Sequence, residues 1–181
     1  MVYDFRFSRS LVDFFGGSGF RAKVGYVFIK KAMKEHNADI AGETSGHFFY
    51  KKLSYVESSE LTMLKILKFV ADSGKSIGEL IKPFQKYSYS NEINMDISHN
   101  PDIKNKINGI LKEKYIGVKS EEFDGLTMDS WGAESGKRWW FNLRPSNTES
   151  LLRFIVEADT KELMDEKINE LMGIIKGPSS A

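Results

Sequence analysis

The hydrophobic pattern of this 181-residue chain changes character near Pro83. Before that point, short apolar runs alternate with segments of helical period, and the expected strands and helices lie at 2–7, 8–15, 25–36, 38–41, 48–50 and 58–70. Ser58 or Ser59 is expected to cap the last of these helices, and Gly74 to end it. A β–α alternation of this kind favours a mixed α/β layer.

The second part of the chain is dominated by strands. After a short helix at 77–81, strands are expected at 87–97, 117–123, 126–131, 138–143 and 151–157. Asp124-Gly125 predicts a hairpin turn. Such a pattern, with two helices, predicts an antiparallel sheet backed by both, an α+β arrangement. We therefore expect domains at 1–75 and 76–177, and a disordered tail at 178–181.

Start signals are expected for the two helices of the second part. Asn100 is suited to the N-cap, with Pro101 at the first helical position. The apolar residues that follow keep helical spacing and predict one buried face, formed by Ile103, Ile107, Ile110 and Leu111. For the last helix, Asp159 and Glu162 indicate a capping box.

Composition excludes several classes of protein. The chain has 26 Lys and Arg against 25 Asp and Glu, so no basic surface for nucleic acid is expected. It has no cysteine, hence no disulfide framework and no thiolate metal site. No apolar run approaches the roughly 18 to 20 residues of a membrane span, and charges interrupt the N-terminus where a signal peptide would be apolar. We expect a cytoplasmic protein without a membrane partner.

Residues 144–150 form the most informative segment: Arg144-Pro145-Ser146-Asn147-Thr148-Glu149-Ser150. A guanidinium pairs bidentately with phosphate oxygens, and three small polar side chains together with turn N–H groups add further donors. The segment predicts a phosphate site. The alternative is a polar loop with an incidental arginine, because Pro, Ser, Asn and Thr are common in loops.

A second loop occupies 41–47, between two apolar runs. Its glycines allow a tight backbone around Glu43, Ser45 and His47. The carboxylate and the hydroxyl suit neighbouring sugar hydroxyls, and the imidazole can exchange a proton near neutral pH. A loop histidine without a role is the alternative for His47. For the aromatic residues Trp131, Trp139, Trp140 and Phe141, core packing is favoured over sugar stacking.

The two loops together resemble a known family. G-E-T-S-G-H at 42–47 and R-P-S-N-T-E-S-L-L-R at 144–153 are similar to motifs of the α-D-phosphohexomutases, specifically the phosphomannomutase/phosphoglucomutase group. The segments 2–9 and 24–30 resemble further parts of that family. Its members have four domains, with the sugar loop in the third and the phosphate loop in the fourth. The resemblance therefore implies part of domain three followed by domain four.

The resemblance also implies an activity. Family members interconvert hexose 1-phosphate and hexose 6-phosphate through a bisphosphorylated sugar that reorients, with the phosphoryl group carried on a serine. Mg²⁺ and glucose or mannose 1,6-bisphosphate are the expected cofactors of the full-length enzyme. The non-reacting phosphate would be held by Arg144, Ser146, Asn147 and Thr148. The sugar hydroxyls would be read by Glu43 and Ser45, and His47 and Arg6 would face the reacting centre.

Two elements of the family are missing. The Mg²⁺ loop, D-x-D-x-D-R, has no counterpart here, and the phosphoserine loop, S-H-N-P, belongs to domain one. Ser98-His99-Asn100-Pro101 has the same letters but follows the sugar loop, and a helix cap explains it. We expect the C-terminal half of a mutase, inactive alone, whose partners are hexose phosphate and the N-terminal domains. The alternative is a stand-alone sugar-phosphate binding module without catalysis.

Departures from the family pattern affect details. Tyr26 stands where the family usually has His, and Ser150 replaces the usual Pro, which should loosen the phosphate loop. Thr44 stands where related subgroups carry Met, Glu or Gln. Asn147, where phosphoglucosamine mutases have Gly, favours mannose and glucose phosphates.

Overall fold

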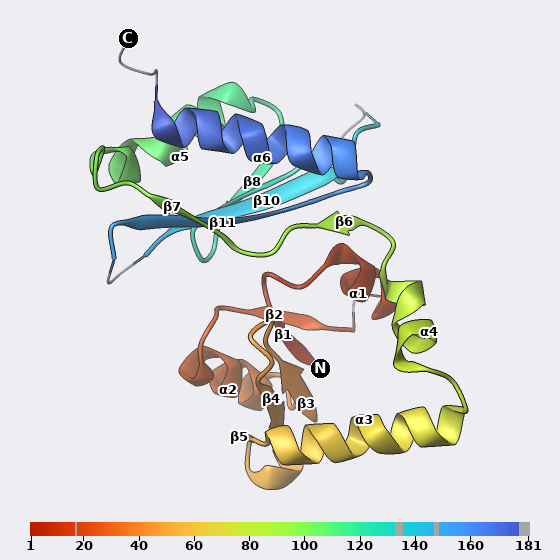
Figure 1. Cartoon of the computed structure of the whole chain (residues 1–181). Helices are drawn as coiled ribbons and strands as arrows, with labels where there is room; N and C mark the ends of the chain where they lie inside the picture. The colour runs from red at the N-terminus through yellow and green to blue at the C-terminus, as the bar shows by residue number, and fades with distance from the viewer. Residues whose placement is uncertain (17, 133–135, 147–148, 178–181) are drawn as a thin grey trace. The chain divides into compact units, whose positions relative to one another are not determined.

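The computed structural model describes residues 1–16, 18–132, 136–146 and 149–177 (Figure 1). Contacts divide the chain into two units, Met1–Lys86 and Tyr87–Ala181. The sequence placed a domain limit after residue 75, whereas the first contact unit extends to Lys86. Its last residues stay with it because the ring of Phe84 packs edge-on against Phe14, with centroids 4.9 Å apart. The expected tail at 178–181 lies outside the described residues.

The first unit is a five-stranded mixed sheet with helices, as the alternation predicted. The strands lie in the order β2 (Phe20–Ala22), β1 (Val2–Asp4), β3 (Ile40–Gly42), β4 (Phe48–Tyr50) and β5 (Val56–Glu57). Strands β1, β2 and β3 are parallel, β4 pairs antiparallel with β3, and β5 pairs antiparallel with β4. The helices are α1 (Arg9–Phe14), α2 (Tyr26–Glu35), α3 (Ser59–Ser73) and α4 (Ile77–Ile81). Short 3₁₀ turns occupy Lys51–Leu53 and Lys82–Phe84.

Helix α2 supplies one side of the first unit's core. Its Ile29 and Met33 are fully buried against strand residues that include Val2, Ala41 and Phe49. These two residues are four positions apart, so they lie on one helical face. The cap predictions for α3 are confirmed: the hydroxyl of Ser58 accepts a hydrogen bond from Leu61 N at 3.1 Å, and Gly74 ends the helix at φ 64°.

Helix α3 buries little of its apolar surface. Its sequence is rich in apolar residues at helical spacing, yet Leu64, Leu67 and Phe69 are 58–61% exposed. The one buried residue of the helix is Thr62, whose hydroxyl shares a 2.8 Å hydrogen bond with that of Tyr50. The helical period of the apolar residues therefore predicted the helix but not which of its residues are buried.

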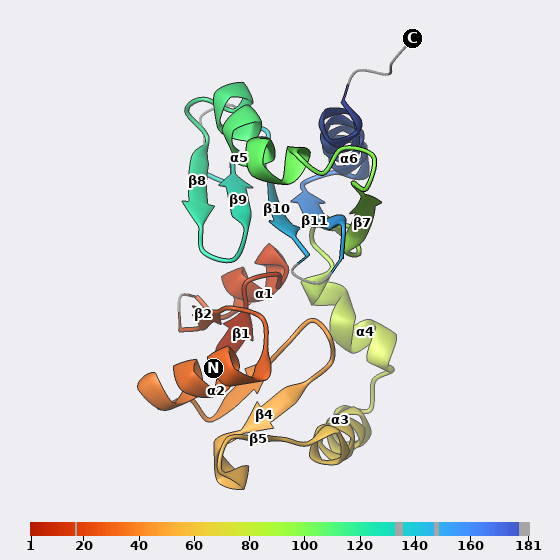
Figure 2. The same ribbon diagram turned by 90° about the vertical axis from the view of Figure 1, so that its left-hand side faces the viewer.

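The second unit is an antiparallel sheet covered by α5 (Ile103–Lys114) and α6 (Lys161–Lys176), as predicted (Figures 1 and 2). Its strands lie in the order β6 (Ser88–Tyr89), β11 (Leu151–Ala158), β10 (Trp139–Pro145), β9 (Leu126–Asp129) and β8 (Lys119–Glu122). Strand β7 (Ile93–Asp96) also pairs with β11, next to β6 in sequence. The single strand expected at 87–97 is thus two short strands, both on the same edge of β11.

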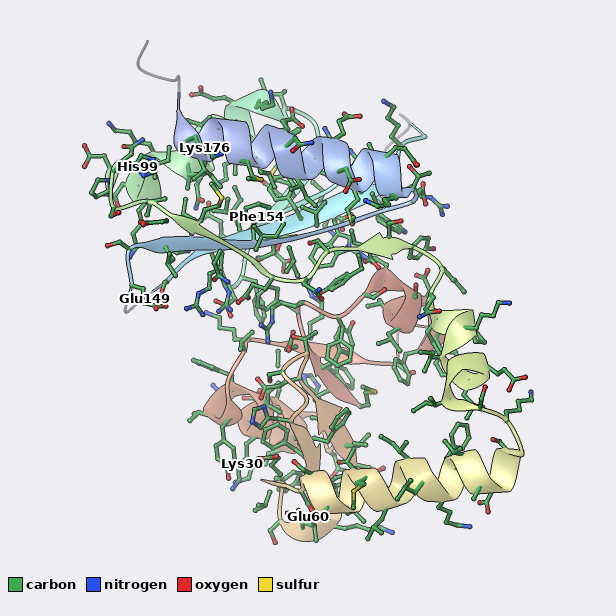
Figure 3. All side chains as sticks on the ribbon, viewed as in Figure 1. Lys30, Glu60, His99, Glu149, Phe154 and Lys176 are labelled. Carbon is green, nitrogen blue, oxygen red and sulfur yellow. The ribbon has the colours of Figure 1, made fainter. Side chains whose placement is uncertain are left out.

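The core of the second unit lies between this sheet and its two helices. Phe141 and Phe154 project from β10 and β11, and Leu111, Leu171 and Ile175 meet them from α5 and α6; all are at most 1% exposed. In Figure 3, Phe154 lies between β11 and α6. Alternate residues of each strand build this layer, as expected for a half-covered sheet.

The cap predictions for α5 and α6 are wrong in detail. Helix α5 begins at Ile103, and Asn100 contributes its backbone carbonyl, which accepts from Ile103 N at 3.1 Å. Helix α6 is capped by Thr160, whose hydroxyl accepts from Leu163 N at 3.2 Å. Asp159 instead forms a salt bridge with Arg138 at the start of the neighbouring strand, at 2.9 Å. The local pattern assigned the carboxylate of Asp159 to the cap of α6, but this carboxylate pairs with Arg138, which is distant in sequence.

The packing interpretation of the aromatic residues is confirmed for β10. Trp139 and Phe141 stack with centroids 5.7 Å apart, and both belong to the core. Trp140, on the opposite face, is 3% exposed and donates from Nε1 to the fully buried Glu157 at 2.6 Å. The indole N–H thus has the partner that a buried tryptophan needs.

The predicted turn at Asp124-Gly125 is present between β8 and β9. Gly125 has φ 78°, and a Cβ at this position would lie 2.4 Å from the carbonyl oxygen of Leu143. Only glycine fits this conformation and this close approach of β10. The turn is therefore set by both the local backbone and a neighbouring strand.

Candidate functional site

The sugar loop connects β3 to β4 in the first unit. Glu43 N donates to the carbonyl of His47 at 2.9 Å, and Gly46 N donates to the carbonyl of Glu43 at 2.9 Å, with Gly46 at φ 88°. Thr44, Ser45 and His47 are exposed, whereas Glu43 is 6% exposed. The tight turn thus leaves Ser45 and His47 exposed and turns the carboxylate of Glu43 inward.

Glu43 is partly engaged within the protein. Its Oε1 accepts a 2.8 Å hydrogen bond from Gly25 N, the residue that precedes α2. Gly25 has φ 117°, a conformation that L side chains rarely adopt. Within the described residues no hydrogen bond reaches Oε2, so one oxygen of this carboxylate can accept from a ligand.

Ser45 and His47 form an exposed pair. Ser45 Oγ lies 2.9 Å from His47 Nδ1, and the hydroxyl donates when His47 carries its proton on Nε2. In that tautomer Nε2–H faces away from the serine. The pair is thus arranged for hydrogen bonding with a polar ligand such as a sugar hydroxyl.

Asp4 links the sugar loop to Arg6, and sequence reasoning assigned it no role. This carboxylate is fully buried. Its oxygens accept from Arg6 N at 2.8 Å, Arg6 Nε at 3.2 Å and Arg6 Nη2 at 3.0 Å, and from Thr44 N at 2.7 Å and Thr44 Oγ1 at 2.9 Å. Asp4 therefore fixes both the guanidinium and the loop. An acidic residue within the apolar run 2–5 was the available signal.

Tyr26, at the family's usual histidine position, opens helix α2. Its hydroxyl accepts from Lys30 Nζ at 3.1 Å, and Lys30 lies on the outer side of the helix (Figure 3). A hollow of about 380 Å³ runs along this helix, lined by Tyr26, Val27, Lys30, Lys31, Lys34 and Glu35. It contains no predicted site residue, so we do not assign the sugar site to it.

The phosphate loop connects β10 to β11 in the second unit. Arg144 is the penultimate residue of β10, and Ser146 follows that strand. Ser146 is 6% exposed; its N donates to Leu151 O at 2.9 Å, and its Oγ accepts from Glu149 N at 3.2 Å. Asn147 and Thr148 lie outside the described residues, so their predicted phosphate contacts stay predictions.

Two arginines lie side by side at this loop. Arg144 and Arg153 are register partners on the antiparallel strands β10 and β11. Arg144 Nη2 donates to Glu92 at 2.9 Å, and Arg153 Nη2 donates to Glu149 at 2.5 Å. Arg153 Nε is buried without a hydrogen-bond partner among the described residues. Each guanidinium thus has a carboxylate beside it. No local pattern indicated that Glu92 pairs with Arg144, because the two residues are 52 positions apart.

The loop is also held from the side of α5. Lys104 Nζ, in the first turn of that helix, donates to Ser146 O at 2.9 Å. Ile97 N donates to Ser150 O at 2.9 Å, which brings the Ser98–Pro101 segment to the same end of the unit. Figure 3 shows His99 and Glu149 at that end. Sequence reasoning gave Lys104 no role.

The described residues contain neither a cluster of metal-ligating side chains nor a helix that could span a membrane. No group of three or more His, Cys, Asp and Glu side chains there could hold a metal ion. None of the described helices is both long and apolar enough to cross a membrane.

Two family models match the chain, one for each unit. Residues 6–87 match "Phosphoglucomutase/phosphomannomutase, alpha/beta/alpha domain III", and residues 92–173 match "Phosphoglucomutase/phosphomannomutase, C-terminal domain". Together they include almost all described elements.

Similar proteins carry mutase names. A phosphomannomutase of Methanocaldococcus jannaschii is 42% identical over 97% of this chain, and one of Escherichia coli K12 is 28% identical over 97%. The chain spans only 37% and 38% of their lengths. A crystal structure of a phosphoglucomutase/phosphomannomutase family protein from Burkholderia thailandensis matches 99% of this chain and 38% of its own, with 22% identity and a TM-score of 0.68. This last likeness shows the fold.

Proposed function

The chain belongs to the phosphoglucomutase/phosphomannomutase family, with its domains three and four, and we propose that it recognises substrate for an enzyme that interconverts hexose 1-phosphate and hexose 6-phosphate. The observation that carries this proposal is the phosphate loop. Arg144, near the end of β10, and the buried Ser146 that follows this strand bring a guanidinium and a hydroxyl to one end of the β10–β11 strand pair, and both groups are suited to a phosphate.

Each loop has a separate role in the proposal. Arg144 and Ser146, with Asn147 and Thr148, hold the phosphate that is not reacting. Glu43, through Oε2, and Ser45 accept and donate hydrogen bonds to sugar hydroxyls. A sugar that must reorient between two half-reactions needs contacts of this kind, because hydroxyl groups are available in both orientations.

His47 and Arg6 are proposed to act near the reacting centre. Nδ1 of His47 shares a hydrogen bond with Ser45, which leaves Nε2 as the ring nitrogen available to the substrate. Arg6 provides a guanidinium whose orientation is fixed by Asp4. A fixed positive charge stabilises developing negative charge without reorganisation.

The phosphoryl-transfer chemistry is assigned to other parts of the enzyme. We propose, as the resemblance implies, that the transferable phosphate is carried on a serine of domain one and that Mg²⁺ binds in domain two. The described residues offer no ligand set that fits Mg²⁺. We propose that this chain alone is inactive as a mutase and that its location is cytoplasmic.

An NMR titration of the chain with mannose 1-phosphate, glucose 1-phosphate and inorganic phosphate tests the proposal. We expect amide shifts at 144–153 with all three ligands and at 43–47 with the sugar phosphates only. Affinity should be roughly millimolar, about 4 kcal/mol, because only part of the enzyme is present. No shift in either loop at roughly ten times that concentration would overturn the proposal.

A further inference from the structure

Among the described residues, Arg144, Arg153 and Lys104 are cations at the phosphate loop, and they differ in how their charges are compensated. Arg144 is bound to Glu92 and Arg153 to Glu149, so both guanidinium charges face a carboxylate. Lys104 is bound to a neutral group, the carbonyl oxygen of Ser146, at 2.9 Å. Within the described part of the chain no carboxylate lies within salt-bridge distance of its ammonium.

The bond from Lys104 to a neutral carbonyl oxygen differs from the bonds of the other lysines in the second unit. Among the described residues of this unit, the other lysine side chains with bonds are each paired with a carboxylate: Lys112 with Glu122, Lys114 with Glu170, Lys161 with Asp165, and Lys167 with Glu166 and Glu170. Lys104 comes from another element, 42 residues before Ser146 in sequence, and places an uncompensated positive charge at the loop.

We propose that Lys104 is a phosphate-binding residue of this loop. Its ammonium has three donors and uses one for Ser146 O, so two are available for phosphate oxygens. A lysine ammonium binds phosphate as a point charge, whereas the guanidinium of Arg144 binds it as a planar fork. The same hydrogen bond fixes the carbonyl of Ser146 and thereby the backbone that leads into the loop.

This inference rests on the proposed function and adds a residue to it. The two arginines alone bring little net charge, since Glu92 and Glu149 offset them. A phosphate dianion needs net positive charge in its site, and Lys104 supplies it. Its side chain lies on an exposed turn of α5, so it can follow the phosphate without repacking the core.

Titration of the 181-residue chain with inorganic phosphate, observed by NMR of the loop amides, tests the role. Lys104→Met should weaken binding about tenfold, the equivalent of one charge-assisted hydrogen bond, and Lys104→Arg should restore most of it. Lys106→Met is the matched control, since this lysine is exposed on the same helix and has no bond to the described residues of the loop. It should bind as the unchanged chain does.

A direct readout needs no variant. The Nζ resonance of Lys104 should shift with phosphate and reach half its change at the same concentration as the Ser146 amide. If that resonance does not move while the loop amides do, Lys104 holds the loop without touching phosphate, and the proposal is overturned even if Lys104→Met fails to fold.

The remaining outcomes separate the two proposals. Unchanged affinity in Lys104→Met, with loop shifts retained, would overturn the role of Lys104 and leave the proposed function standing. Equal losses in Lys104→Met and Lys104→Arg would also overturn it, because a charge-based role predicts rescue by arginine. If phosphate moves no loop amide in the unchanged chain, the proposed function fails, and the role of Lys104 fails with it.

Discussion

Arg144 and Arg153 lie directly opposite each other on β10 and β11, and each guanidinium donates to a carboxylate, Glu92 or Glu149. Like charges opposite each other on neighbouring strands repel, and the two carboxylates offset that repulsion. The arrangement holds two planar donor groups ready at the loop in the absence of phosphate. It also means that a phosphate must share Arg144 with Glu92.

Replacing Arg144 by Ala should weaken phosphate binding at least about tenfold, because a bidentate, charged contact is lost. The measurement is the phosphate titration of loop amides. Arg138→Ala is the control: Arg138 lies near the other end of β10 and forms a salt bridge with Asp159. Equal affinity in Arg144→Ala and the unchanged chain would remove Arg144 from the site.

Glu92→Gln should have the opposite effect. Glutamine can still accept from Arg144 Nη2 but does not repel the phosphate, so binding should strengthen about threefold or more. Isothermal titration with inorganic phosphate measures the change. Weaker binding would mean that the carboxylate of Glu92 is needed to orient Arg144.

Asp4→Asn should destabilise the first unit and disturb the sugar loop together. The buried carboxylate accepts five hydrogen bonds from Arg6 and Thr44, and its replacement removes the negative charge beside the largely buried guanidinium of Arg6, at a cost of about 3 kcal/mol. Chemical denaturation gives the free energy of unfolding, and the Thr44 amide shift reports the loop. Asp39→Asn, at an exposed position of the same unit, should change neither.

Gly125→Ala should destabilise the second unit by roughly 2 kcal/mol or more, because φ is positive and a methyl group would clash with Leu143 O. Gly109→Ala, in α5, has open space around it and should be neutral or slightly stabilising. Thermal unfolding of both variants makes the comparison. Similar melting temperatures would mean that the hairpin relaxes at little cost.

Glu170→Gln should make the stability of the second unit less dependent on acid pH. Desolvation raises the pKa of Glu170, but hydrogen bonds from Lys167, Tyr115 and Lys114 outweigh it and lower that pKa from 4.5 to about 2. Because the folded pKa is the lower one, the carboxylate stabilises the fold above about pH 4.5, and this contribution is lost between pH 4.5 and about 2.

The difference in melting temperature between the unchanged chain and Glu170→Gln should therefore be largest near neutral pH and shrink on acidification through that window. Glu113→Gln, at an exposed position of α5, serves as the control and should show no such trend. A difference that stays constant down to pH 2 would contradict the role of the charge.

Local sequence predicted much of the architecture because the signals are short-range. Period-two and helical patterns indicated most strands and helices. Ser58 indicated the start of α3 through a hydrogen bond within its first turn, and Gly74 indicated its end through a positive φ. The same kind of reasoning was wrong for Asp159, whose carboxylate pairs with Arg138 across the sheet. For α3 the helical spacing of apolar residues predicted the helix, but these residues are largely exposed. The spacing alone does not indicate what a helix packs against.

The sequence by itself determined the two loops, the residue types they present and the family to which they belong. Their chemistry lies in contiguous residues, so no fold is needed to see it. Only the tertiary structure decided which distant groups complete each loop: Asp4 and Gly25 at the sugar loop, and Glu92, Arg153 and Lys104 at the phosphate loop. Strand register and helix packing bring these groups within hydrogen-bonding distance, and no spacing in the sequence encodes that distance.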